Sequence, residues 1–152
     1  MNTLYDTDFY QWTFHNAELL RQGKLTEIDI PNIAEELESM GKSEKRELFS
    51  RLAVLVMHLL KWQYQSQKRS NSWLATINTQ RMDIELLLQD SPSLKHDIDK
   101  ILNEVYINAK KMFERETGIS KKQLPETCPY TFMQVRNNDF WPEVVDLQVK
   151  NQ

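Results

Sequence analysis

Glycine and proline are scarce in this sequence: three glycines and five prolines occur among 152 residues. So few glycines leave no glycine-rich phosphate-binding loop and no dinucleotide-binding fingerprint. No runs of alternating apolar and polar residues are bounded by turn dipeptides, so little of the chain suits a β-sheet. The sequence therefore predicts helices joined by short turns.

Cysteine is almost absent, because Cys128 is the one cysteine of the chain. A lone cysteine cannot form an internal disulfide, which favours a reducing compartment. The N-terminal stretch MNTLYDTDFYQW lacks the basic region and apolar run of a signal peptide. No unbroken apolar run approaches the roughly 20 residues of a membrane crossing. We therefore expect a cytoplasmic protein without a membrane partner.

The length and composition fit one globular domain. Apolar residues make up 40% of the 152 residues and charged residues 27%, which is typical of a soluble protein. No linker interrupts the chain, so we expect residues 1–152 to form a single helical domain.

The stretch from Ser43 to Gln67 is the most apolar part of the chain. Two lines of apolar residues recur there at spacings of three and four, and they are Leu48, Leu52, Leu55, Leu59 and Trp62, beside Phe49, Ala53, Val56 and Leu60. Together they form an arc wider than a surface helix needs, which predicts a central buried helix. The remaining stripe contains Glu47, Arg51, His58 and Lys61 on one face.

Further helices are predicted around this central one. Their expected bounds are Asp6 or Thr7 to Gln22, Pro31 into the central helix with a kink at Gly41, Trp73 to Gln89, Pro92 to Thr117, and a short helix from Pro129. The side chains expected to point inward from the first two are Phe9, Trp12, Leu19, Leu20, Ile33, Leu37 and Met40. Arg81 falls on the inward line of the third, where a charge needs a partner. The predicted fold class is all-α, a compact bundle of about five helices.

Charge is segregated along the chain. Residues 1–47 contain ten acids and five bases, residues 48–82 no acid and five bases, and residues 83–152 twelve acids and nine bases. The three segments therefore carry −5, +5 and −3. The acid-free middle segment predicts either an exposed basic surface or a segment paired internally with the acidic N-terminal one.

A set of motifs occurs in a recognisable order. They are AEELESMGKSEKRELFSRL, HLLKWQYQ, RSNSWLATINTQR, DSPSLK and PETCPYT, followed by FWP. In order and spacing the chain resembles, from about Tyr5 to Pro142, the uncharacterised bacterial domain-of-unknown-function family twenty-nine, well represented in cyanobacteria. The resemblance implies a compact helical protein and no established activity, substrate or cofactor. Ser66 departs from the proline expected after HLLKWQYQ, which affects the end of the central helix. The motif positions that carry over are Glu35, Glu36, Arg51, His58, Lys61, Trp62, Arg69, Trp73 and Arg81.

Arg51 and His58 are the candidate catalytic pair, with Lys61 adding charge. An arginine and a histidine two turns apart on one helical face resemble the pair of the HEPN ribonucleases. Histidine can shuttle a proton near neutral pH, and arginine can hold a phosphate by two hydrogen bonds. The pair would cleave RNA without a metal. The alternative is a structural polar edge in which Glu47 pairs with Arg51.

A metal site is not predicted. Glu35, Glu36 and Glu38 resemble the acidic set of helical nucleotide pyrophosphatases, but the third position of that set holds Ser39. No glutamate is followed by histidine three places later, as di-iron bundles require. We expect no metal and no cofactor.

The acid-free stretch is the candidate binding surface. Residues 61–81 interleave Lys68, Arg69 and Arg81 with Trp73 and other aromatic rings, a combination that binds single strands. The alternative is an internal pairing that brings Glu35, Glu36 or Glu38 near Arg69 or Arg81. The whole chain is acidic, with a pI near 5.6, so nucleic acid is the less favoured partner.

The sequence as a whole favours a non-enzymatic protein-interaction module. A metal-independent ribonuclease and a single-strand binder are the alternatives, and the question of enzymatic activity stays open. A protein partner or a homodimer fits the wide apolar arc.

Overall fold

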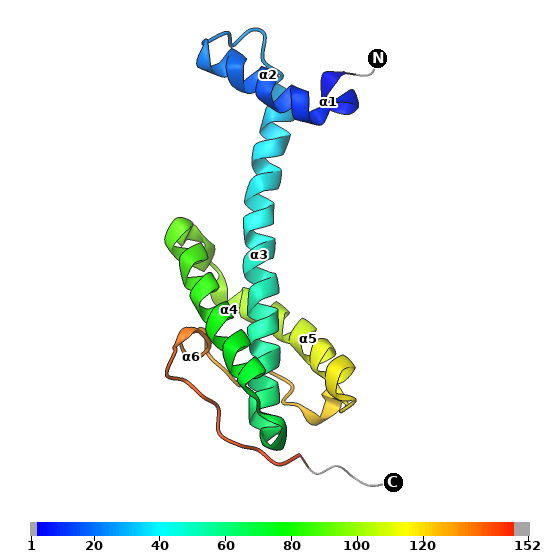
Figure 1. The fold of residues 1–152 in the computed structure, drawn as a ribbon, viewed down its shortest axis with the longest axis vertical. Helices are drawn as coiled ribbons and strands as arrows, with labels where there is room; N and C mark the ends of the chain where they lie inside the picture. The colour runs from blue at the N-terminus through cyan, green and yellow to red at the C-terminus, as the bar shows by residue number, and fades with distance from the viewer. Residues whose placement is uncertain (1–2, 148–152) are drawn as a thin grey trace. The chain divides into compact units, whose positions relative to one another are not determined.

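The computed structural model describes residues 3–147, and all regular structure within that range is helical (Figure 1). The α-helices are α1 (Leu4–Thr7), α2 (Phe9–Arg21), α3 (Ile30–Tyr64), α4 (Asn71–Asp90), α5 (Ile98–Thr117) and α6 (Phe132–Arg136). Short 3-10 turns are η1 (Ser66–Lys68), η2 (Pro92–Lys95) and η3 (Lys121–Gln123). The predicted all-α fold class is confirmed.

The contacts divide the chain into two compact units that meet within α3, between Ser43 and Glu44. The N-terminal unit contains α1, α2 and the first turns of α3. The C-terminal unit contains the rest of α3 with α4, α5 and α6. One domain over residues 1–152 stays a prediction beside this division.

The core of the C-terminal unit is built on α3. Leu48, Leu52, Leu55, Leu59 and Leu60 are completely buried there, and each contributes roughly 1.5–3 kcal/mol by leaving water. Residues of α4, α5 and α6 close around them, with Ile77, Ile84, Val105, Phe113 and Val135 at almost no exposure. The predicted central buried helix is therefore confirmed in this unit, where α4 and α5 flank α3 (Figure 1).

The predicted helix boundaries differ from the observed ones at several ends. α3 is one helix from Ile30 to Tyr64, which agrees with the predicted continuation through Gly41, but it ends before η1 rather than at Gln67. Asp97 adopts a left-handed conformation with φ 60°, which separates η2 from α5 and delays the helix predicted from Pro92. A short aspartate tolerates this region better than most residues.

Side-chain caps explain where α2, α4 and α6 begin. Asp8 accepts from the backbone N–H of Gln11 at the start of α2, and Ser70 accepts from Trp73 N–H at the start of α4. Thr131 and Gln134 form a reciprocal capping box on α6. These caps lie one to three residues from the expected starts at Asp6 or Thr7, Trp73 and Pro129, because several polar side chains near each start qualify by type.

The inward side of the N-terminal unit was predicted wrongly. Of the side chains expected inward there, Trp12 is buried, whereas Phe9, Leu20, Leu37 and Met40 are 45–65% exposed. Trp12 and Asn16 are the buried residues of this unit among residues 3–43. An amphipathic pattern identifies an apolar face, but it does not show that a neighbouring element covers that face.

Candidate functional site

Arg51 joins α3 to α4. Its Nε donates to Glu47 Oε1 at 3.0 Å, one turn earlier on α3, and its Nη1 donates to Asp83 Oδ2 on α4 at 2.9 Å. The glutamate partner is the one expected from the structural alternative. The guanidinium of Arg51 is therefore already paired with two carboxylates, which compete with any phosphate for its positive charge.

His58 is half-buried on the same helix. Its Nδ1 lies 2.9 Å from the carbonyl oxygen of Val54, which fits a ring that donates from Nδ1. Burial lowers the pKa of His58, and the nearby Lys61 lowers it further, while Glu116 on α5 acts in the opposite direction. The lowered pKa favours the neutral form of the imidazole. The carboxylate near it belongs to α5, whereas Arg51 reaches α4.

Lys61 is buried between the two flanking helices. Its Nζ forms an ion pair with Glu116 of α5 and lies 5.4 Å from the ring centre of Trp73 on α4. A carboxylate and an aromatic face both stabilise a buried ammonium group. Lys61 thus connects three helices, and Trp73 is half-buried beneath it. The catalytic prediction for Arg51, His58 and Lys61 stays a prediction.

The other charges of the acid-free stretch differ in exposure. Arg69 donates from Nε to the carbonyl oxygen of Trp62 at 2.9 Å and lies 4.6 Å over the ring of the same tryptophan. Lys68, in η1, is exposed. The cationic groups of Arg69 and Lys61 therefore already lie over tryptophan rings of the stretch proposed to stack nucleic-acid bases.

Arg81 is 1% exposed and is held by backbone carbonyls. It donates to Val135 O at 2.9 Å, Phe140 O at 2.8 Å and Asn138 O at 3.5 Å, and its guanidinium lies over the ring of Trp141. The pairing with N-terminal glutamates that we expected for Arg81 is corrected by these contacts. Val135 lies in the last turn of α6, and Asn138 and Phe140 follow it without regular structure, so these carbonyls lack helical N–H partners.

The two predicted N-terminal binding residues have separate surroundings. Glu35 is exposed. Glu36 accepts a hydrogen bond from the hydroxyl of Tyr5, and this bond raises the pKa of Tyr5 to about 12. Glu36 therefore fastens the first turns of the chain to α3.

A polar clamp fixes the turn between α2 and α3. The indole N–H of Trp12 donates to Asp29 Oδ2 at 2.9 Å, and the amide oxygen of Asn16 accepts from Asp29 N–H at 2.9 Å. Hydrogen bonds from Asn32 and Trp12 lower the pKa of Asp29. This clamp holds α2 against the beginning of α3 with little apolar burial.

An apolar groove lies between these two helices. Its volume is about 320 Å³, and it is lined by Trp12, Thr13, Asn16, Ala17 and Leu20 of α2 and by Ile33, Glu36, Leu37 and Met40 of α3. Leu37 and Met40 are 63% and 65% exposed. Sequence reasoning found this face of α3 but assigned it to the interior, so the groove itself was missed.

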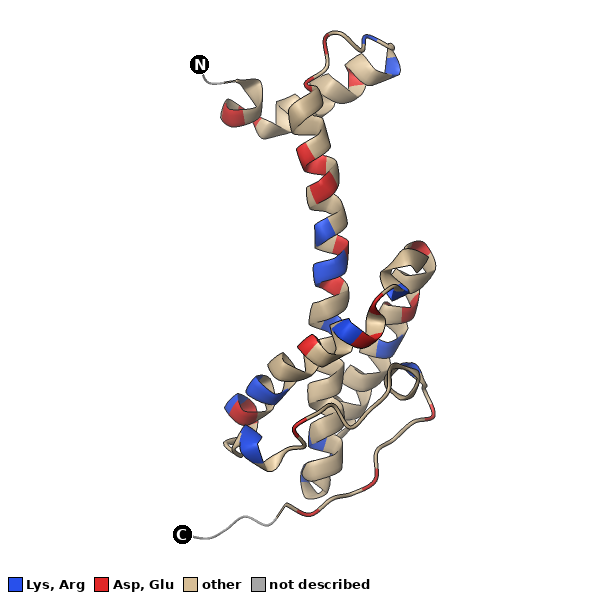
Figure 2. Ribbon diagram, turned by 180° about the vertical axis from the view of Figure 1, so that it is seen from behind, with Lys and Arg blue, Asp and Glu red and all other residues tan. Residues whose placement is uncertain are grey.

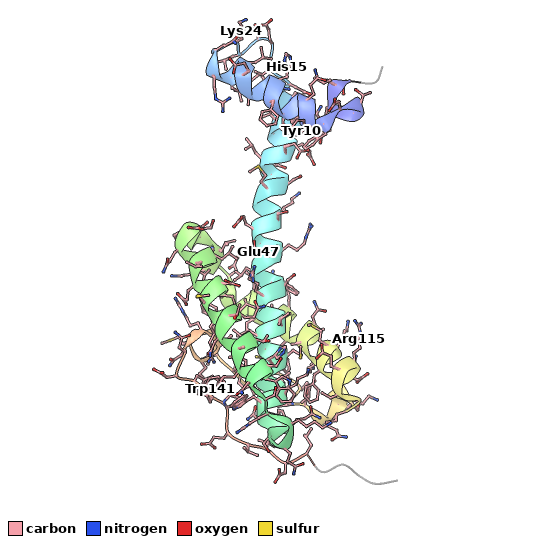
Figure 3. The ribbon with its side chains drawn as sticks, viewed as in Figure 1. Tyr10, His15, Lys24, Glu47, Arg115 and Trp141 are labelled. Carbon is pink, nitrogen blue, oxygen red and sulfur yellow. The ribbon has the colours of Figure 1, made fainter. Side chains whose placement is uncertain are left out.

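Exposed apolar side chains gather in the N-terminal unit. Eight of the fourteen large ones in the part of the chain that the structure describes lie within residues 3–43. They are Phe9, Tyr10, Phe14, Leu20, Leu25, Ile30, Leu37 and Met40. Tyr10, labelled in Figure 3, is 75% exposed. The exposed apolar side chains are therefore denser in this unit than in the rest of the described chain.

The described residues contain neither a membrane-spanning helix nor a cluster of metal-ligating side chains. No helix there combines the length and the apolar stretch that a membrane crossing requires. Between residues 3 and 147, no three side chains of His, Cys, Asp or Glu come together as metal ligands would.

Comparison with known proteins identifies the family. A family model described as "Domain of unknown function DUF29" matches residues 4–141. No curated protein and no solved structure matches this chain. The match includes the motifs on which the resemblance rested, except Pro142 at the end of FWP, while the bacterial origin stays a prediction. The chain therefore belongs to the DUF29 family, whose function is uncharacterised.

Proposed function

We propose that this protein is a non-enzymatic protein-interaction module and that its N-terminal groove is the docking surface. The observation that carries the proposal is the apolar groove between α2 and α3 in a unit that buries Trp12 as its large apolar side chain. A partner that fills the groove would complete the core that this unit lacks.

The size of the N-terminal unit explains why it needs a partner. Units of about 40 residues seldom bury enough surface to be stable without a disulfide, a metal or association. The described part of this unit has no cysteine, and its α2–α3 junction is held by the polar clamp of Trp12, Asn16 and Asp29. Association supplies the missing burial.

The exposed groove residues offer enough energy to make docking favourable. Covering Leu37 and Met40 from their present exposure of 63% and 65% would contribute roughly 1–2 kcal/mol each. Leu20, 45% exposed on the other wall, adds a third contact. Several such anchors are needed because association costs at least about 4 kcal/mol in lost freedom.

The experiment places a photoreactive residue at position 37 of the full chain in its source cells. We expect discrete crosslinked adducts, which disappear when Met40→Asp is added and persist with Met82→Asp. Met82 is the matched control because it is also a helical methionine, 59% exposed on α4. The crosslinked segment, made as a peptide, should then bind the purified chain and its Met82→Asp variant but not Met40→Asp. A second chain with the photoreactive residue at position 82 gives the background, and adducts from position 37 identical to that background, or no adducts at all, would refute the proposal.

The ribonuclease and single-strand alternatives stay predictions. The partners of Arg51 and Lys61 favour a structural role, since Glu47, Asp83 and Glu116 neutralise them. Arg81 has a structural partner set as well. Among the predicted basic binding residues, Lys68 is the one whose side chain is exposed.

A further inference from the structure

The N-terminal unit is acidic as well as apolar. Between residues 3 and 43 there are eight acids and three bases, so this part carries −5. Figure 2 shows acidic positions on α1 and on the first turns of α3. The basic residues are Arg21, Lys24 and Lys42, none of which lines the groove. A partner entering the groove therefore meets an apolar floor in a negative field.

The groove itself contains a carboxylate. Glu36 is the charged side chain among the groove residues, and it is half-buried. Its Oε1 accepts from the Tyr5 hydroxyl, which leaves Oε2 able to accept from an ammonium or guanidinium group. Because Tyr5 holds the carboxylate in place, a cation on the partner would meet it with little further loss of side-chain freedom.

The dimensions of the groove fit a short helix. Its walls run from Trp12 to Leu20 on α2 and from Ile33 to Met40 on α3, and seven to eight residues of helix rise about 10–12 Å. Each wall is thus two turns long. Helix-in-groove recognition uses apolar anchors at i, i+3, i+4 and i+7, which span the same two turns.

From these observations we infer that the occupant of the groove is a basic amphipathic helix of a partner protein, with Glu36 pairing with its Lys or Arg. The inference rests on the proposed docking function. A second copy of the chain fits less well, because two units of −5 would face each other within a screening length of about 8 Å. A basic helix instead complements both the apolar floor and the charge.

The test uses three designed helical peptides and the full-length chain. All carry leucines at i, i+3, i+4 and i+7, and their polar faces consist of Lys, Gln or Glu. By fluorescence anisotropy, we expect the Lys peptide to bind more tightly than the Gln peptide and the Glu peptide not to bind. Its affinity should fall as salt rises. Leu37→Ser should abolish binding of the Lys peptide, which separates the groove from the acidic surface in general.

Glu36→Gln tests the charge within the groove. We expect it to weaken binding of the Lys peptide by about three- to tenfold and to leave the Gln peptide unaffected. Glu27→Gln is the matched control, because it removes the same charge from the same unit at an exposed position outside the groove. It should leave both affinities nearly unchanged.

Several results would overturn the inference. These are equal binding of the Lys and Gln peptides, no binding of the Lys peptide, binding that survives Leu37→Ser, or equal effects of Glu36→Gln and Glu27→Gln. Sedimentation that shows a dimer lost in Leu37→Ser would identify the occupant as a second copy and would also overturn it. In each of these cases the position-37 crosslinks can still support docking, so failure of the inference is distinguishable from failure of the proposed function.

Discussion

Replacing Arg81 should destabilise the protein strongly, because this charged side chain of α4 is buried and holds backbone carbonyls of the C-terminal segment. The side chain is 1% exposed, and its two short bonds join α4 to the carbonyls of Val135 and Phe140. A hydrogen bond from a charged donor contributes about 1.5–3 kcal/mol. Arg81→Met removes both and also the weaker bond to Asn138. It restores some stability because the buried charge, whose pKa burial lowers, no longer has to be desolvated.

The expected net loss is about 3 kcal/mol of unfolding free energy, a large share of the roughly 5–15 kcal/mol that stabilises a typical domain. With a urea m-value of about 2 kcal/mol/M, the midpoint should fall by roughly 1.5 M. The urea midpoint of Arg81→Lys should lie between those of the unmodified protein and Arg81→Met, because one ammonium group cannot reproduce the forked hydrogen bonds of the guanidinium. Loss of the cation over Trp141 should also change tryptophan emission in the folded state.

Arg136→Met is the matched control for this prediction. Arg136 also joins α6 to α4, through Glu85 at 2.8 Å, but both side chains of that pair are about one-third exposed. A pair so open to solvent contributes less than about 1 kcal/mol. Urea titrations followed by circular dichroism and by fluorescence compare the two variants. An Arg81→Met variant no less stable than Arg136→Met would refute the assignment of Arg81 as the anchor of the C-terminal segment.

Three further predictions concern titration, thiol reactivity and catalysis. Burial lowers the pKa of His58 in the folded chain, so the unfolded chain binds more protons below about pH 6.5. The free energy of unfolding should therefore be greatest above about pH 6.5 and fall as the pH drops. The slope of unfolding free energy against pH should be smaller in His58→Gln. Urea midpoints between pH 5 and 8 measure it, and an unchanged slope would contradict the assignment. Burial also raises the pKa of the Cys128 thiol. At pH 8, iodoacetamide should therefore alkylate Cys128 more slowly in the folded chain than in the chain unfolded by urea. Equal alkylation rates would contradict the burial of this thiol. Mixed RNA incubated with the protein and a chelator should stay intact, because two carboxylates already pair with Arg51. RNA cleavage that is lost in His58→Ala, with helicity unchanged, would instead establish the ribonuclease.

The helical core was predictable because the information is local. From Leu48 to Leu60 the apolar residues repeat at spacings of three and four over a wide arc, and such an arc can be buried only by neighbours on several sides. The same reasoning located the need for a partner at Arg81. It did not identify that partner, because the carbonyls of Val135 and Phe140 are more than 50 residues away along the chain.

The N-terminal groove shows the opposite case. Ile33, Leu37 and Met40 repeat as regularly as the core leucines, and the pattern was assigned to the interior. Periodicity reports which residues share a face, and this holds for buried and exposed faces alike. Whether that face is covered depends on the chain elsewhere, and in the N-terminal unit the clamp at Asp29 places α2 beside α3 without filling the groove.

By itself, the sequence determined the helical class, the buried length of α3 and the segregation of charge, because these follow from composition and short-range spacing. The tertiary structure decided which charges are neutralised, which carbonyls Arg81 holds and which apolar face stays open. Those outcomes depend on contacts between segments far apart in the chain, and no local pattern encodes the geometry of such contacts.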